Sequence, residues 1–112
     1  HSAFTAYDDG WGLAGDGQKV TDGEYSKFNN GWHHHSEIVV DLQWRNVCSG
    51  KMQCELLFNE RVAFQLDPCK VYRLAVSMKD TEYALEWLSF RKHTNAIGVQ
   101  EESNKHRLYA YG

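Results

Sequence analysis

Three consecutive histidines beside a tryptophan are the residues in this sequence with the clearest capacity for chemistry. They are His33, His34 and His35, directly after Trp32. Because adjacent side chains of an extended chain point to opposite sides, at most His33 and His35 share a face. Such a pair could ligate zinc or copper, or the run could be a solvated loop of neutral imidazoles. A third interpretation is a sugar site, in which imidazoles hydrogen bond to hydroxyls and the indole stacks on the C–H face of a pyranose.

Other loop residues could extend a sugar platform of this kind. Three of them are aromatic, and two polar residues come from the connection before Val62. Core packing is the alternative for each ring, and it is the preferred interpretation for Trp44 and Trp87, which lie among strand residues. The predicted ligand-binding residues are therefore Trp32, His33, His35, Tyr7, Trp11, Phe28, Asn59 and Arg61.

A short acidic turn could hold a metal ion. Thr21, Asp22 and Gly23 have the composition of a tight turn. Aspartate and backbone carbonyl oxygens are ligands that a hard cation such as calcium prefers. A plain turn explains the same three residues, so both interpretations stay open.

The first residue, His1, allows two further inferences. A free amino-terminal histidine could chelate copper through its amine and ring, with a second histidine completing the brace found in lytic polysaccharide monooxygenases. Because the sequence starts with His rather than Met, we also expect that a secretory signal was removed and that the protein is secreted. Of the three cysteines, Cys48 and Cys54 could form a bridge or remain buried free thiols. The odd count leaves at least one free thiol or one cross-chain bond.

Nucleophilic catalysis has little support. Ser36 and Ser77 lie in no Gly-x-Ser-x-Gly motif, and there is no glycine-rich phosphate loop. The neighbouring carboxylates at 8–9 and 101–102 point to opposite sides of an extended chain and are typical of a solvated surface. The sequence therefore does not indicate an enzyme.

The length and net charge of the chain limit which classes of protein it can belong to. The 112 residues suit a single domain, 1–112. Twelve Lys and Arg against fifteen Asp and Glu give a net charge of −3, the wrong sign for a protein that neutralises nucleic-acid phosphates. No apolar run is long enough for a membrane span. With 42% hydrophobic residues, the chain can bury a core.

Alternating apolar and polar residues predict an all-β fold. Six of the nine glycines fall in the first 31 residues, which we expect to form turns and irregular loops. The period-two runs at 38–42, 62–66 and 72–78 predict strands. The segment 81–90 also fits a helical spacing, but a strand is the better choice in an all-β chain, and 107–111 suits a closing strand. Strands at roughly ten-residue spacing favour a sandwich or barrel.

The order of these motifs resembles the discoidin or coagulation factor five/eight type C family, which includes galactose-binding-like carbohydrate-binding modules. The resemblance rests on Asp22-Gly23, on Trp32, and on the strand at 38–42 with its Val-Asp-Leu ending. The segment 72–77 is similar to the family's strand carrying Val-Ser, and 106–109 is similar to its closing arginine-bearing strand.

This resemblance implies an antiparallel jelly-roll β-sandwich with sugar bound at the loop tips. It also implies a structural calcium, whose candidate ligands are Thr21, Asp22, Glu24 and Ser26. The leading hypothesis is a secreted, non-catalytic, lectin-like carbohydrate-binding module. Its expected partner is a glycan or glycoconjugate. Several copies of the module, or a larger multidomain protein that contains it, would bind this partner. The alternatives are a protein- or lipid-interaction module of the same fold and a copper enzyme that uses His1.

Overall fold

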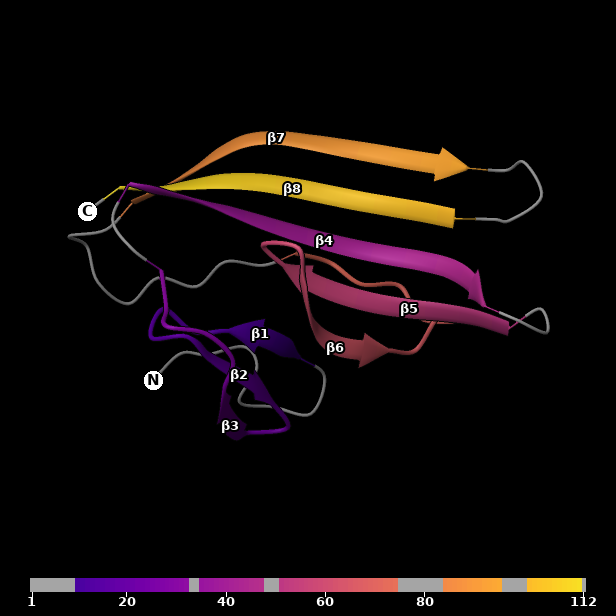
Figure 1. Cartoon of the computed structure of the whole chain (residues 1–112), viewed down its shortest axis with the longest axis horizontal. Coiled ribbons are helices and arrows are strands. Elements are labelled where there is room, and N and C mark those ends of the chain that lie inside the picture. The colour runs from indigo at the N-terminus through magenta and orange to yellow at the C-terminus, as the bar shows by residue number, and fades with distance from the viewer. Residues whose placement is uncertain (1–9, 33–34, 48–50, 75–83, 96–100, 112) are drawn as a thin grey trace. The chain divides into compact units, whose positions relative to one another are not determined.

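The computed structural model describes residues 10–32, 35–47, 51–74, 84–95 and 101–111. Within these ranges the regular structure consists of strands only, which confirms the predicted all-β class (Figure 1). No described segment is a helix that could cross a membrane. The strands are β1 (Trp11–Leu13), β2 (Gln18–Thr21), β3 (Glu24–Lys27), β4 (Ser36–Val47), β5 (Lys51–Phe58), β6 (Arg61–Leu66), β7 (Ala84–Asn95) and β8 (Glu101–Tyr111).

The strands form two antiparallel sheets, one with the order β1-β2-β3 and one with the order β6-β5-β4-β8-β7. The chain also divides into two compact units. The first contains the three-stranded sheet. The second, Glu37–Tyr72 together with Glu86–Tyr109, contains nearly all of the five-stranded sheet.

The three-stranded sheet is built on a two-residue hairpin. Thr21 pairs with Glu24, and the two residues between them, Asp22 and Gly23, both have positive φ, at 52° and 75°. A tight hairpin turn of this type needs positive φ at both central positions, and Asp-Gly is among the sequences that adopt it most readily. Val20 of β2, 2% exposed, lies in the core of this unit.

The paired strands β4 and β5 of the five-stranded sheet have one apolar and one polar face. In β4, Ile38 and Val40 are buried, and Val40 pairs with the buried Phe58 of β5. Because strand side chains alternate, the intervening residues of β4 project from the opposite face. There Asp41 pairs with Leu57, and Gln43 pairs with Glu55. We call this second side the polar face.

Several strands differ from the sequence-based expectation. The glycine-rich first third was expected to be irregular, yet it contains β1, β2 and β3. Strand β5 was not predicted from the sequence. The predicted strand at 72–78 is not formed at 72–74, and its remainder lies outside the described residues. In contrast, β4, β6, β7 and β8 each contain or overlap a predicted strand.

Cys54 is a buried free thiol, and Cys69 is an exposed one. The Cys48–Cys54 bridge considered from the sequence is therefore not present. Cys48 itself lies outside the described residues. Burial is the main reason why the pKa of Cys54 is raised to about 11, with smaller contributions from the carboxylates of Glu55 and Asp67.

Candidate functional site

The aromatic residues predicted to bind sugar have different environments in the first unit. Phe28 is 6% exposed, so its ring belongs to the core. Trp11, in β1, and Trp32 are half-buried. The backbone amide of Trp32 donates to the carbonyl of Gly15 at 3.1 Å, which fixes the tryptophan beside the turn before β2. Rings that are partly accessible can still offer an edge or a face to a ligand.

Two of the predicted ligand-binding residues lie outside the described residues: His33 and Tyr7. His1, the proposed copper ligand, also lies outside them. His35 is exposed and has a positive φ of 58°. Its backbone amide donates to the carbonyl of Ala110 at 2.7 Å. The structure therefore leaves the pairing of His33 with His35 as a prediction.

Asn59 and Arg61 belong to the second unit, at the turn between β5 and β6. Asn59 and Glu60 form a two-residue turn with φ of 48° and 70°. The Asn59 side-chain carbonyl accepts a hydrogen bond from the Val39 amide at 2.7 Å, and the Asn59 amide donates to the Val39 carbonyl at 2.8 Å. Asn59 thus ties this turn to β4, a structural role that sequence reasoning did not anticipate.

The predicted calcium ligands lie on the β2–β3 hairpin. Asp22, Glu24 and Ser26 are exposed there, and Thr21 is half-buried. Within the described ranges, no three His, Cys, Asp or Glu side chains are grouped closely enough to hold a metal ion. The turn geometry by itself explains why Asp-Gly occurs at this position.

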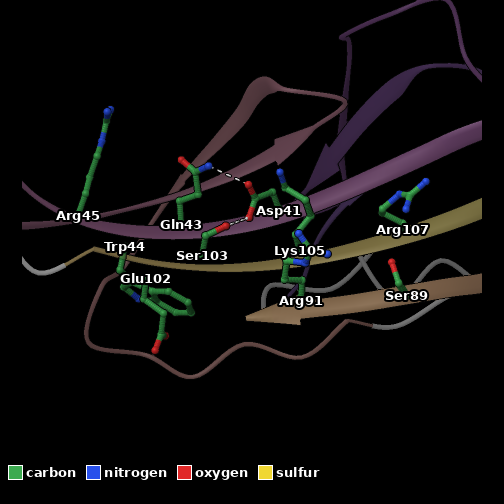
Figure 2. Close-up of a pocket in the computed structure, with 10 residues that line it drawn as sticks. All are labelled: Asp41, Gln43, Trp44, Arg45, Ser89, Arg91, Glu102, Ser103, Lys105 and Arg107. Carbon is green, nitrogen blue, oxygen red and sulfur yellow. Dashed lines mark hydrogen bonds between the residues drawn. The ribbon is translucent and has the colours of Figure 1, made fainter. Parts of the chain in front are cut away.

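A pocket of about 710 Å³ lies over β4, β8 and β7 in the second unit (Figure 2). Most of its lining side chains project from the polar face, whereas Trp44 and Glu102 point to the other side of the strands. Its lining residues are Asp41, Gln43, Trp44, Arg45, Ser89, Arg91, Glu102, Ser103, Lys105 and Arg107. We call this the polar-face pocket.

The Asp41 carboxylate is the buried centre of this pocket. Asp41 is 5% exposed, and each of its oxygens accepts a hydrogen bond. Gln43 Nε2 donates to Oδ2 at 2.7 Å, and Ser103 Oγ, from the adjacent strand, donates to Oδ1 at 2.6 Å. A buried carboxylate requires such donors, because losing water without replacement would cost several kcal/mol. The two bonds fix the positions of the amide and the hydroxyl.

A second buried carboxylate, Glu55 of β5, continues this arrangement across the polar face. Arg45 Nη2 donates to Glu55 Oε1 at 2.8 Å, and Gln65 Nε2 of β6 donates to Oε2 at 2.6 Å. Gln53 in turn donates to Gln65 Oε1 at 3.0 Å. Side-chain hydrogen bonds thus link the adjacent strands β4, β5 and β6. They hold Arg45 beside the pocket.

Cations surround the pocket. Arg107 makes a two-pronged ion pair with Glu37, and this contact lowers the pKa of Glu37 and raises the pKa of Arg107. Within the part of the chain that the structure describes, Arg91 and Lys105 make no ion pair, although both line the pocket. The site therefore combines fixed hydrogen-bonding groups with two cations that make no ion pair within the described residues.

Sequence reasoning missed this site, although a signal for it was present. Polar residues recur at every second position of β4 as Asp41, Gln43 and Arg45, and of β8 as Ser103, Lys105 and Arg107. Alternation places each set on one face of its strand. The missing information was that β4 and β8, about sixty residues apart, are neighbours in one sheet.

Comparisons with known proteins found no matching family model, no similar curated protein and no matching solved structure. The resemblance to the discoidin or factor five/eight type C family therefore rests on the sequence motifs alone.

Proposed function

We propose that this chain is a secreted, non-catalytic carbohydrate-binding module with a galactose-binding-like jelly-roll sandwich fold, and that the polar-face pocket holds the saccharide. The observation that carries the proposal is the buried Asp41 carboxylate, fixed by Gln43 and Ser103 within an open pocket. This position differs from the loop tips that the family resemblance implies.

The chemistry of the pocket suits a polyhydroxylated ligand. A sugar hydroxyl both donates and accepts hydrogen bonds, so it is best recognised by carboxylates, amides, hydroxyls and guanidinium groups held at fixed positions. Asp41, Gln43, Ser103 and Arg45 supply one group of each kind. Because the pocket is open to water, we expect a dissociation constant of about 10 μM to 1 mM for one site. Several copies or a multidomain parent would then supply avidity.

Titration calorimetry on a glycan selected from an array tests this proposal. Gln43→Ala should weaken binding about three- to tenfold, which corresponds to one net hydrogen bond. Gln53→Ala is the matched control, because Gln53 projects from the same face of β5 without lining the pocket. A folded protein that binds no glycan, or equal losses for the two variants, would contradict the proposal.

A further variant tests the loop-tip position. If Trp32→Ala abolishes glycan binding while Gln43→Ala has no effect, the sugar binds near the half-buried indole of the first unit instead. Glycan binding would then stand, and the assignment to the polar-face pocket would be wrong. Trp11→Ala is a suitable companion, because Trp11 is also half-buried.

One observation favours a second candidate function, a protein-interaction module. Strand β7 is an edge of the five-stranded sheet, and it exposes Trp87 at 60%, Leu88 at 41% and Phe90 at 51%. Exposed apolar residues on an edge strand are typical of surfaces that add a partner's strand. If Trp87→Ser abolishes binding of a defined protein partner while glycan binding measured by titration stays unchanged, this alternative is supported.

A further inference from the structure

The polar-face pocket has an excess of positive charge at one end. Of its cations, Arg45 is paired with Glu55, and Arg107 is paired with Glu37. Arg91 and Lys105 have no ion-pair partner among the described residues. Glu102 does not neutralise them, because it pairs with Lys92 at 3.2 Å and points to the other side of the sheet (Figure 2).

The two cations without an ion-pair partner come from neighbouring strands of the sheet. Arg91 is on β7 and Lys105 is on the neighbouring β8. Both side chains line the polar-face pocket, and Figure 2 shows them on the same side of the strands as Asp41 and Arg107. Two cations that line one pocket repel each other. An anion bound between them would remove that repulsion.

The cationic end and the Asp41 centre are close enough for one ligand to reach both. Ser103, which donates to Asp41, and Lys105 are two residues apart on β8. Two strand residues span about 7 Å, a distance that a sugar ring with its substituents covers. A single saccharide unit can therefore place hydroxyls at Asp41 and an acidic substituent at Arg91 and Lys105.

We propose that Arg91 and Lys105 bind the carboxylate or sulfate group of an acidic saccharide whose hydroxyls hydrogen bond at Asp41. This inference rests on the proposed function and adds the chemical class of the ligand. A saccharide fits better than a nucleic acid, because the Asp41 carboxylate accepts hydrogen bonds and a saccharide supplies several hydroxyl donors around one ring. The net charge of −3 also disfavours a long polyanion.

The test compares three matched oligosaccharides by calorimetry: one neutral, one carrying uronic acids and one carrying sulfates. We expect an acidic ligand to bind at least about tenfold more tightly than the neutral one, the effect of one charge-assisted hydrogen bond. The two acidic arms show whether carboxylate or sulfate is preferred. Added salt should weaken the acidic ligand selectively.

Variants that remove the charges of Arg91 and Lys105 test whether these two cations cause the preference for an acidic ligand. Arg91→Gln combined with Lys105→Gln should reduce acidic binding about tenfold or more and thereby remove the preference for the acidic oligosaccharide over the neutral one. Lys51→Gln is the control, because Lys51 is an exposed cation of β5 outside the pocket. Circular dichroism and the melting temperature should show that the double variant remains folded, since removing two like charges relieves repulsion.

The outcomes separate this inference from the proposed function. Equal binding of neutral and acidic oligosaccharides overturns the inference and leaves glycan binding intact. Binding of a polyphosphate or single-stranded DNA as tightly as the acidic sugar also overturns it, because the site would then recognise charge alone. Absence of binding to any of the three oligosaccharides overturns both proposals.

Discussion

Replacing Glu55 by alanine should destabilise the second unit, because Glu55 links three strands. Its side chain is 8% exposed and accepts hydrogen bonds from Arg45 of β4 and Gln65 of β6. Alanine removes both acceptors at once. The donors remain close enough to solvent to hydrogen bond with water, since the Arg45 side chain is 48% exposed and Gln65 is also exposed.

The expected loss follows from these two bonds. A hydrogen bond to a charged group contributes about 1.5 to 3 kcal/mol when it is shielded from water. The Arg45 contact is discounted because that cation is half-exposed and partly screened. The Gln65 contact, at 2.6 Å, is discounted for the same reason, because Gln65 is also exposed. We therefore expect Glu55→Ala to lower the free energy of unfolding by about 2 to 4 kcal/mol.

Urea unfolding measures this loss, and Gln53→Ala is its control. Gln53 makes one exposed hydrogen bond to Gln65, so its removal should cost no more than about 1 kcal/mol. The denaturant slope should stay the same in both variants if only the native state changes. A loss below about 1 kcal/mol for Glu55→Ala would refute the reasoning, because the polar face would then contribute little to strand alignment.

Three further predictions follow from single side chains. Burial lowers the pKa of His106, so the folded state binds its proton less tightly than the unfolded state does. The free energy of unfolding should therefore be complete above about pH 6.5 and should fall as the pH drops below that value. His106→Gln should remove this pH dependence, which lies at higher pH than the titration of Glu37. In native protein, a maleimide should modify the exposed Cys69 and spare the buried Cys54, as peptide mapping would show; rapid labelling of Cys54 would contradict its burial. Calcium at 100 times its dissociation constant should add about 2.7 kcal/mol to stability, an effect that Asp22→Asn should remove; an unchanged melting temperature after chelation would leave Asp22 with a turn role alone.

The strand pattern was predictable where one face of a strand is clearly apolar. In the segment 38–42, which lies within β4, the apolar side chains of Ile38, Val40 and Leu42 share one face of the strand. Strand β5 was harder to predict, because its polar residues Gln53 and Glu55 gain their partners only from neighbouring strands. The short strands of the first third follow glycine-rich turns, whose composition by itself indicates only loops.

The predicted sugar site depended on residue type, whereas the observed pocket depends on strand pairing. Trp32 and His35 were selected because indole and imidazole are suited to sugar recognition. Asp41 and Ser103 carry no such local signal, since each is an ordinary polar residue in its own strand. They become a site because β4 and β8 pair and bring Ser103 Oγ within 2.6 Å of Asp41. Long-range pairing of this kind cannot be read from one sequence.

The two different faces of β4 and β5 explain how a small chain can hold polar side chains at fixed positions. Ile38, Val40 and Phe58 on one face supply apolar burial, which fixes the strands. The opposite face is then free to carry Asp41 and Glu55, whose hydrogen bonds set the orientation of their neighbours. Groups held on strands keep their geometry better than groups on loops, so less ordering is required when a ligand binds. This physical reason favours the polar face over the loop tips as the proposed position of the saccharide.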